Sequence, residues 1–201
     1  MVDDVLRMMD HLGIQRAHVI GYSLGGFITI KLMTQHPERL VSAIPCAAGW
    51  ERHDIGDHQV RLDAMIEGMD RGDFAPMLRE VGLQNKGFGK IKVAMVSSFF
   101  RRINDTEALA AVLRALPEPE VTEAELRANT VPVLSVAGSR DTLKKGIDAM
   151  TGILACHHVI IIKGGDHNST LAHRAYIRAL REFLRQHSAV AYPAESGKKH
   201  R

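Results

Sequence analysis

Apolar residues along the chain follow two alternating patterns, short continuous runs and longer helical periodicities. The continuous runs lie at residues 17–20, 40–48, 131–137 and 159–162, and each is followed within two residues by a glycine. Residues 3–13, 24–35 and 170–187 instead repeat their apolar positions at helical spacing. Buried parallel strands are apolar throughout, whereas a helix that covers them is apolar on one side. The pattern therefore predicts an α/β fold, with a mostly parallel sheet of about four strands flanked by helices.

The middle of the chain lacks strand-like runs. Apolar clusters at residues 64–66, 74–81, 93–103 and 108–116 predict several helices there. We therefore expect a helical cap inserted at residues 50–127, an α/β core formed by residues 1–49 and 128–187, and a loose polar tail at 188–201. The cap residues Met65, Met95 and Phe99, with Tyr22 of the core, are candidates for lining a substrate pocket. The alternative is that Met65, Met95 and Phe99 belong to the hydrophobic core of the insertion itself, and for any one of them it is at least as good an interpretation.

Composition and charge narrow the possible partners. The 201 residues are 45% apolar and carry a net charge of +3, from 26 basic and 23 acidic side chains. Lys198, Lys199 and Arg201 account for much of that excess, so the remainder is almost neutral. A nearly neutral body argues against a nucleic-acid or anionic-membrane surface. No apolar stretch approaches the ~20 residues of a membrane span.

Two cysteines, Cys46 and Cys156, each lie in an apolar run. We expect both to be small buried side chains, without a disulfide framework, which fits a cytoplasmic protein. Residues 1–5 also lack the basic-then-apolar order of a signal peptide.

The strongest chemical signal is the pattern G-x-S-x-G at residues 21–25. It follows the first apolar run and precedes a helical pattern, and such a strand–turn–helix presents its serine, Ser23, at the end of a sheet. The N–H of Leu24 then lies at a helix N-terminus, where it can stabilise an oxyanion. We expect Gly21 and Gly25 to be required because the turn leaves no room for side chains beside the serine. An ordinary turn serine is the alternative.

A serine nucleophile requires a base and an acid that orients the base. Asp141 follows the third predicted strand in the sequence Gly-Ser-Arg-Asp, and His167 follows the fourth in Gly-Gly-Asp-His. Because the carboxyl ends of parallel strands meet at one edge of a sheet, we expect both side chains near Ser23. Taken alone, a helix-capping aspartate and a surface histidine are the alternatives. Asp54 also follows a predicted strand and is the alternative candidate for the acid, although Asp141 is better placed.

One further cluster, residues 53–58 with the sequence His-Asp-Ile-Gly-Asp-His, is dense in possible metal ligands. Its spacing is unlike that of a zinc site, and no second cluster supports it. We therefore expect no metal ion.

Together these stretches resemble the C-terminal part of an enzyme of the α/β-hydrolase fold. The resemblance lies in residues 12–26, 36–40, 131–141 and 164–167, and the helical insertion has no specific match. It implies that Ser23, Asp141 and His167 are nucleophile, acid and base, with Leu24 in the oxyanion hole. It also implies hydrolysis of a small-molecule ester through an acyl-enzyme, with neither a metal nor an organic cofactor. Acyl transfer or perhydrolysis by the same residues stays open.

The serine motif comes early for this fold. Such enzymes have several strands before it, including one whose loop donates a second oxyanion N–H, and the sixteen residues before Ala17 cannot hold them. We expect the chain to be a fragment of a longer enzyme. The alternatives are that it pairs with another copy or a separate chain that supplies the missing half, or that it is a reduced fold with little activity. A non-catalytic protein that binds a ligand or partner is then the alternative to a serine esterase.

Overall fold

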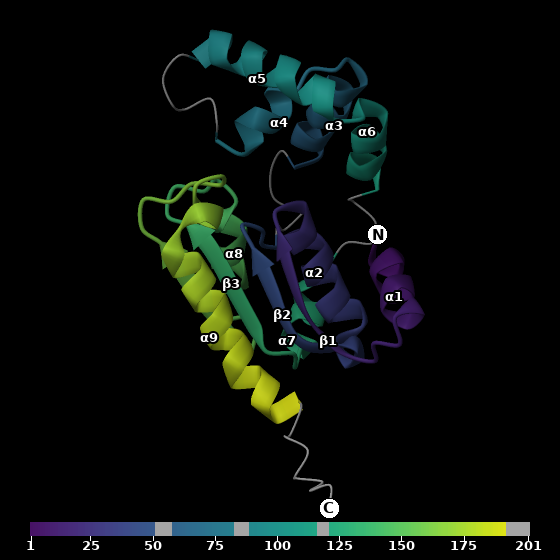
Figure 1. Ribbon diagram of the computed structural model, residues 1–201, viewed down its shortest axis with the longest axis vertical. Coiled ribbons are helices and arrows are strands. Elements are labelled where there is room, and N and C mark those ends of the chain that lie inside the picture. Colours follow the sequence, from purple (N-terminus) through teal and green to yellow (C-terminus); the bar gives the residue numbers. More distant parts are fainter. Residues whose placement is uncertain (51–57, 83–88, 116–120, 192–201) are drawn as a thin grey trace, which may run out of the picture. The chain divides into compact units, whose positions relative to one another are not determined.

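The computed structural model describes residues 1–50, 58–82, 89–115 and 121–191, which belong to two compact units (Figure 1). The first unit comprises Met1–Trp50, Val121–Arg140 and the chain from Lys144 onward. The second comprises the described residues between Trp50 and Val121, together with Asp141–Leu143.

Among the described residues, the first unit contains a four-stranded parallel sheet, as the apolar runs predict. Its strands lie side by side in chain order: β1 (Ala17–Tyr22), β2 (Leu40–Cys46), β3 (Val133–Gly138) and β4 (His157–Ile162). β2 and β3 are buried along their whole length, which explains why each is apolar apart from one buried serine, Ser42 or Ser135. β1 lies at one edge of the described sheet and leaves Ile20 exposed.

Helices cover both faces of this sheet (Figure 1). On one face, apolar side chains of α2 (Leu24–Gln35), α7 (Glu123–Ala128) and α8 (Lys144–Met150) form a buried cluster, against which α1 (Val2–His11) also packs. On the other face, Tyr176 and Phe183 of α9 (Arg174–Ala191) pack on the sheet. Neighbouring strand residues divide between the two clusters, Ala43 to the first and Ile44 to the second, because strand side chains alternate between faces.

Several element ends differ from the predicted ones. The pattern indicates one helix over residues 170–187, but a short 3₁₀ turn (Thr170–Ala172) precedes α9, which continues to Ala191. α7 has no predicted counterpart, although its capping box is readable in the sequence: the Thr122 hydroxyl accepts from the Glu125 N–H, and the Glu125 carboxylate accepts from the Thr122 N–H. Cys46 is buried as expected, whereas Cys156 is exposed because it lies in the turn before β4.

The second unit is helical in its described residues. It contains α3 (His58–Asp70), α4 (Ala75–Glu80), α5 (Gly89–Ile103) and α6 (Thr106–Arg114). Its core includes Met69, Phe74 and Leu78, and Phe74 stacks on Phe100 with 5.5 Å between ring centroids. None of the described helices in either unit combines the length and the apolar character needed to cross a bilayer.

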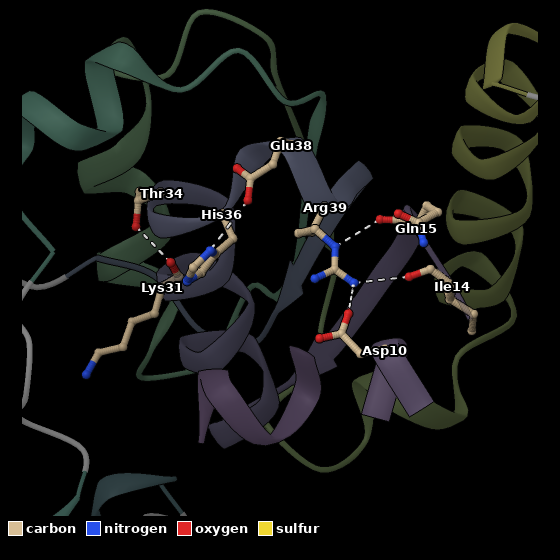
Figure 2. Close-up of polar contacts among 8 residues, drawn as sticks. All are labelled: Asp10, Ile14, Gln15, Lys31, Thr34, His36, Glu38 and Arg39. Carbon is tan, nitrogen blue, oxygen red and sulfur yellow. Dashed lines mark hydrogen bonds and ion pairs between the residues drawn. The ribbon is translucent and has the colours of Figure 1, made fainter. Parts of the chain in front are cut away.

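Two arginines form hydrogen bonds between the start of β1 and the start of β2. The Arg39 guanidinium donates to the carbonyls of Ile14 and Gln15, at 3.1 and 3.0 Å, and pairs with Asp10 at 2.7 Å (Figure 2). Arg16 makes the converse contact, donating to the carbonyl of the first residue of β2 at 2.8 Å. Because β1 leads directly into the serine turn, these contacts help to set the position of that turn.

Candidate active site

Ser23 lies in a strained turn between β1 and α2. Its backbone φ of 53° costs a residue with a Cβ on the order of 1–3 kcal/mol. The Ser23 N–H donates to the Cys46 carbonyl at 2.9 Å, and the Ser23 carbonyl accepts from the N–H groups of Gly26 and Phe27. Leu24 is the first residue of α2, so its N–H has no preceding helical carbonyl to bind. The turn thus presents the Ser23 hydroxyl and the Leu24 N–H at the carboxyl end of the sheet.

The glycines around Ser23 meet different constraints. A Cβ on Gly21 would lie 1.9 Å from the Gly25 carbonyl oxygen, and one on Gly26 would lie 2.5 Å from the Ala48 Cβ. Among the described residues, and apart from its own helix and chain neighbours, nothing lies within 4 Å of a Cβ built on Gly25. The expectation that both motif glycines are needed for space is therefore wrong for Gly25. The crowded positions are Gly21 and Gly26, where α2 starts against the ends of β1 and β2.

The structure brings His167 to Ser23, as the sequence predicts. The His167 Nε2 lies 3.0 Å from the Ser23 Oγ, and His167 is only 6% exposed. In the tautomer that carries its proton on Nδ1, Nε2 accepts the hydrogen of the serine hydroxyl. The two side chains therefore have the geometry of a nucleophile and its general base.

The loop that carries His167 is fastened to the chain beyond β3. The Arg140 N–H donates to the Gly165 carbonyl at 2.9 Å, and the Gly164 N–H donates to the Ser139 hydroxyl at 2.9 Å. The Arg140 side chain also donates to the Gly164 carbonyl. Because β3 and β4 pair in parallel, these bonds set where the loop begins relative to the end of the sheet.

Asp166 shapes the same loop from within. Its Oδ1 accepts the N–H groups of Asn168 and Ser169, at 3.1 and 2.9 Å, and its own N–H donates to the Ser169 hydroxyl. The Thr170 hydroxyl donates to the Asp166 carbonyl at 2.7 Å. Through these bonds, Asp166 holds the turn that carries its neighbour His167.

Tyr22, the residue before Ser23, also contacts His167. Its hydroxyl donates to the His167 carbonyl, and the two rings lie 5.5 Å apart. Tyr176 of α9 meets the Tyr22 ring edge-on, with 6.1 Å between centroids. The place of Tyr22 in a substrate pocket stays a prediction, and its bond to His167 is a contact that the sequence does not reveal.

Asp141 is buried just beyond β3 and groups with the second unit. Its Oδ1 accepts the N–H of Leu143 at 3.0 Å, and the neighbouring Thr142 hydroxyl donates to the Glu80 carbonyl. The role of Asp141 as the acid that orients His167 stays a prediction.

The remaining candidates belong to the second unit or lie outside the described residues. Met95 and Phe99 of α5 are exposed and Met65 of α3 is half-buried, and their part in a pocket stays a prediction. Asp54 and the rest of the possible metal cluster lie outside the described residues, apart from the backbone of His58. Within the described ranges, no three His, Cys, Asp or Glu side chains group in a way that could hold a metal ion.

Comparison with known sequences points to one fold family. The sequence profile described as alpha/beta hydrolase fold matches residues 1–101. The putative carbamate hydrolase RutD of Caulobacter sp. (strain K31) is 43% identical over 54 residues, which cover 27% of this chain and 20% of that protein. The pimeloyl-(acyl-carrier protein) methyl ester esterase of Aliivibrio fischeri (strain MJ11) is 26% identical over 201 aligned residues, covering 92% of this chain and 76% of the esterase. The match to the carbamate hydrolase thus spans one fifth of its length.

Solved structures show the same fold. The enol-lactonase from Burkholderia xenovorans LB400 superposes with a TM-score of 0.68 at 22% identity, over 92% of this chain and 71% of the lactonase. A carboxylesterase structure from Nitrososphaera gargenis superposes with a TM-score of 0.67 at 21% identity, over 93% of this chain and 71% of the esterase.

Proposed function

Because this chain belongs to the α/β-hydrolase fold family, we propose that it is a serine hydrolase that cleaves carboxylic esters through an acyl-enzyme at Ser23. The observation that carries the proposal is the 3.0 Å separation of the Ser23 Oγ from the His167 Nε2, at a turn whose φ of 53° is disfavoured for serine. A strained turn that aims a hydroxyl at an imidazole has a use in nucleophilic catalysis. A protein that only binds a ligand has no need of it.

In the proposed reaction, the Ser23 Oγ attacks the carbonyl carbon of the ester while the His167 Nε2 takes the hydroxyl proton. The Leu24 N–H, at the start of α2, stabilises the negative charge that develops on the carbonyl oxygen. His167 then returns the proton to the departing alcohol. Water attacks the acyl-enzyme with His167 again as base, which frees the acid and restores Ser23. Asp141 is the proposed acid that holds the imidazole in its tautomer and stabilises its cation.

The similar proteins support an acyl substrate of this kind. One is named a methyl ester esterase and another an enol-lactonase, and a third is named a carbamate hydrolase. Esters, lactones and carbamates all present an acyl carbon that a serine hydroxyl can attack with an alcohol or amine leaving. We place a carboxylic ester first because two of these three names denote one, a lactone being a cyclic carboxylic ester.

Labelling with a fluorophosphonate probe, combined with hydrolysis of p-nitrophenyl acetate and butyrate, tests the proposal. We expect the probe to attach to Ser23, no label on Ser23→Ala, and at least about a 10³-fold loss of hydrolysis in His167→Ala. Asp141→Asn, assayed in the same way, tests the proposed acid. Ser188→Ala on α9 is the control, because its hydroxyl binds His18 at the other end of the sheet. A folded, monodisperse wild-type protein that takes no label would leave the ligand-binding alternative.

A further inference from the structure

We propose that Tyr22 is a positioning residue for the serine–histidine pair, because its hydroxyl holds the main chain of His167 so that the imidazole stays on Ser23. This inference rests on the proposed function of the same site. It assigns a task to a side chain that the motif itself leaves unspecified, since the second position of G-x-S-x-G accepts any residue.

Tyr22 is coupled to both members of the pair. It directly precedes Ser23 as the last residue of β1, where it pairs with Cys46 of β2, so the sheet sets its backbone position. Its side chain donates to the His167 carbonyl, and its ring lies 5.5 Å from the imidazole at a tilt of 51°. A single residue therefore ties the strand that carries the nucleophile to the loop that carries the base.

The Tyr22 ring is itself packed against a second aromatic ring. The Tyr176 ring of α9 lies edge-on to it at 6.1 Å and 86°, and Tyr176 is buried. The Tyr176 hydroxyl forms a hydrogen bond with the Cys46 thiol. Burial raises the pKa of Cys46 to about 11 and raises the pKa of Tyr176 well above its usual range, so both groups stay protonated at neutral pH. Neither of these two groups therefore places a charge beside the Tyr22 ring at neutral pH.

The Tyr22 bond acts at a different point of the loop from the other bonds described above. Those bonds hold residues 164–166 and 168–170. Tyr22 holds the carbonyl of His167 itself. The imidazole swings on the Cα of its own residue, so a restraint at that residue limits its displacement most directly. A misplacement of about 1 Å can cost up to about 10²-fold in rate.

Tyr22→Phe tests this role because it removes the hydroxyl and keeps the ring. Tyr176→Phe is the matched control, since it deletes the hydroxyl of the adjacent ring, which binds Cys46. We would measure the rate and the final extent of fluorophosphonate labelling, and kcat and KM for a p-nitrophenyl ester. Tyr22→Phe should label Ser23 to the wild-type extent but about tenfold more slowly, with kcat reduced in proportion and KM within about twofold. Tyr176→Phe should stay within about twofold of the wild type in all four quantities.

The possible results separate the role from its alternatives. A reduced final extent with an unchanged rate would mean that Tyr22→Phe lowers only the fraction of folded molecules, which overturns the positioning role. Equal rates for Tyr22→Phe and the wild type would overturn it too, while leaving the proposed function intact. The same slowing in Tyr176→Phe would assign the effect to packing of the ring pair and would also overturn it. A wild-type protein without label would instead remove the proposed function.

Discussion

At the scale of single residues, the strain at Ser23 is sustained by close backbone contacts around it. The Cys46 carbonyl holds its N–H, and the first turn of α2 holds its carbonyl. Gly21 and Gly26 let the helix start against the strands, because a Cβ at either position would overlap a neighbour. Gly25 lies between them in the sequence, and in the described part of the chain a Cβ there would meet no neighbouring element. The two motif glycines, Gly21 and Gly25, therefore differ in how much they matter for the stability of the fold.

Alanine substitutions at the two motif glycines should thus have opposite effects. Gly25→Ala is expected to leave the free energy of unfolding unchanged or to raise it by up to about 1 kcal/mol, because alanine is the better helix residue. Gly21→Ala is expected to lower it by about 3 kcal/mol, since the new Cβ would lie 1.9 Å from the Gly25 carbonyl oxygen. Urea unfolding followed by circular dichroism measures both. Coincident midpoints for the two variants would contradict the steric argument.

At the scale of elements, contacts outside the strands position the strands. Arg39 lies in the turn before β2, yet it binds two carbonyls and a carboxylate that precede β1 (Figure 2). Its side chain is only 19% exposed, so this network is partly shielded from water. A guanidinium can reach three acceptors at once because its donors are spread over a rigid fork. The pairing of β1 with β2 begins at Ala17 and Leu40, just after this network, so the network supports the start of the strand that leads to Ser23.

We expect Arg39→Ala to lower the free energy of unfolding by about 1–2 kcal/mol, because two backbone carbonyls lose a charged donor. Arg39→Lys should recover only part of the loss, since an ammonium lacks the fork geometry. Chemical denaturation gives both values. Arg7→Ala is the matched control: Arg7 is 79% exposed and pairs only loosely with Asp4 at 3.8 Å, so its loss should stay within about 0.5 kcal/mol. Similar losses for Arg39→Ala and Arg7→Ala would show that the Arg39 network does not contribute to the free energy of unfolding.

At the scale of the whole first unit, two histidines link the sheet's outer strands to their neighbours. On β1, the His18 Nδ1 lies 2.8 Å from the Ser42 hydroxyl, and its Nε2 lies 3.2 Å from the Ser188 hydroxyl of α9. On β4, the His157 Nε2 lies 2.9 Å from the Ser135 hydroxyl. Burial lowers the pKa of both histidines, and the neighbouring His187 and His158 lower them further. The folded state therefore favours both imidazoles in the neutral form.

This predicts a loss of stability on acidification. Both folded pKa values lie below the unfolded value of 6.5, so the unfolded chain binds more protons than the folded chain just below that pH. The free energy of unfolding should therefore fall as the pH drops below 6.5 and be independent of these two groups well above it. Urea unfolding between about pH 5 and 8 measures the profile. The double variant His18→Gln/His157→Gln should show a shallower acid slope, and an unchanged slope would contradict the assignment.

Much of the fold could be read from the sequence because the relevant signals are local. Continuous apolar runs specify buried parallel strands, and the G-x-S-x-G pattern specifies a strand, a turn and a helix. Element ends were less predictable: α9 continues to Ala191, and Cys156 is exposed in a turn despite its apolar neighbours. These details depend on where a residue meets the rest of the molecule, which a short window of sequence does not contain.

The sequence by itself thus determined the α/β class and the family, and it named Ser23, Asp141 and His167 as candidate site residues, each from a motif that is local in the chain. Only the tertiary structure decided that Ser23 and His167, 144 positions apart, come within 3.0 Å. It also decided that Gly26 rather than Gly25 is crowded, and that the Tyr22 hydroxyl reaches the His167 carbonyl. These are distances between separate elements, and they are set by the packing of α2 against the strands and by the bonds that hold the His167 loop.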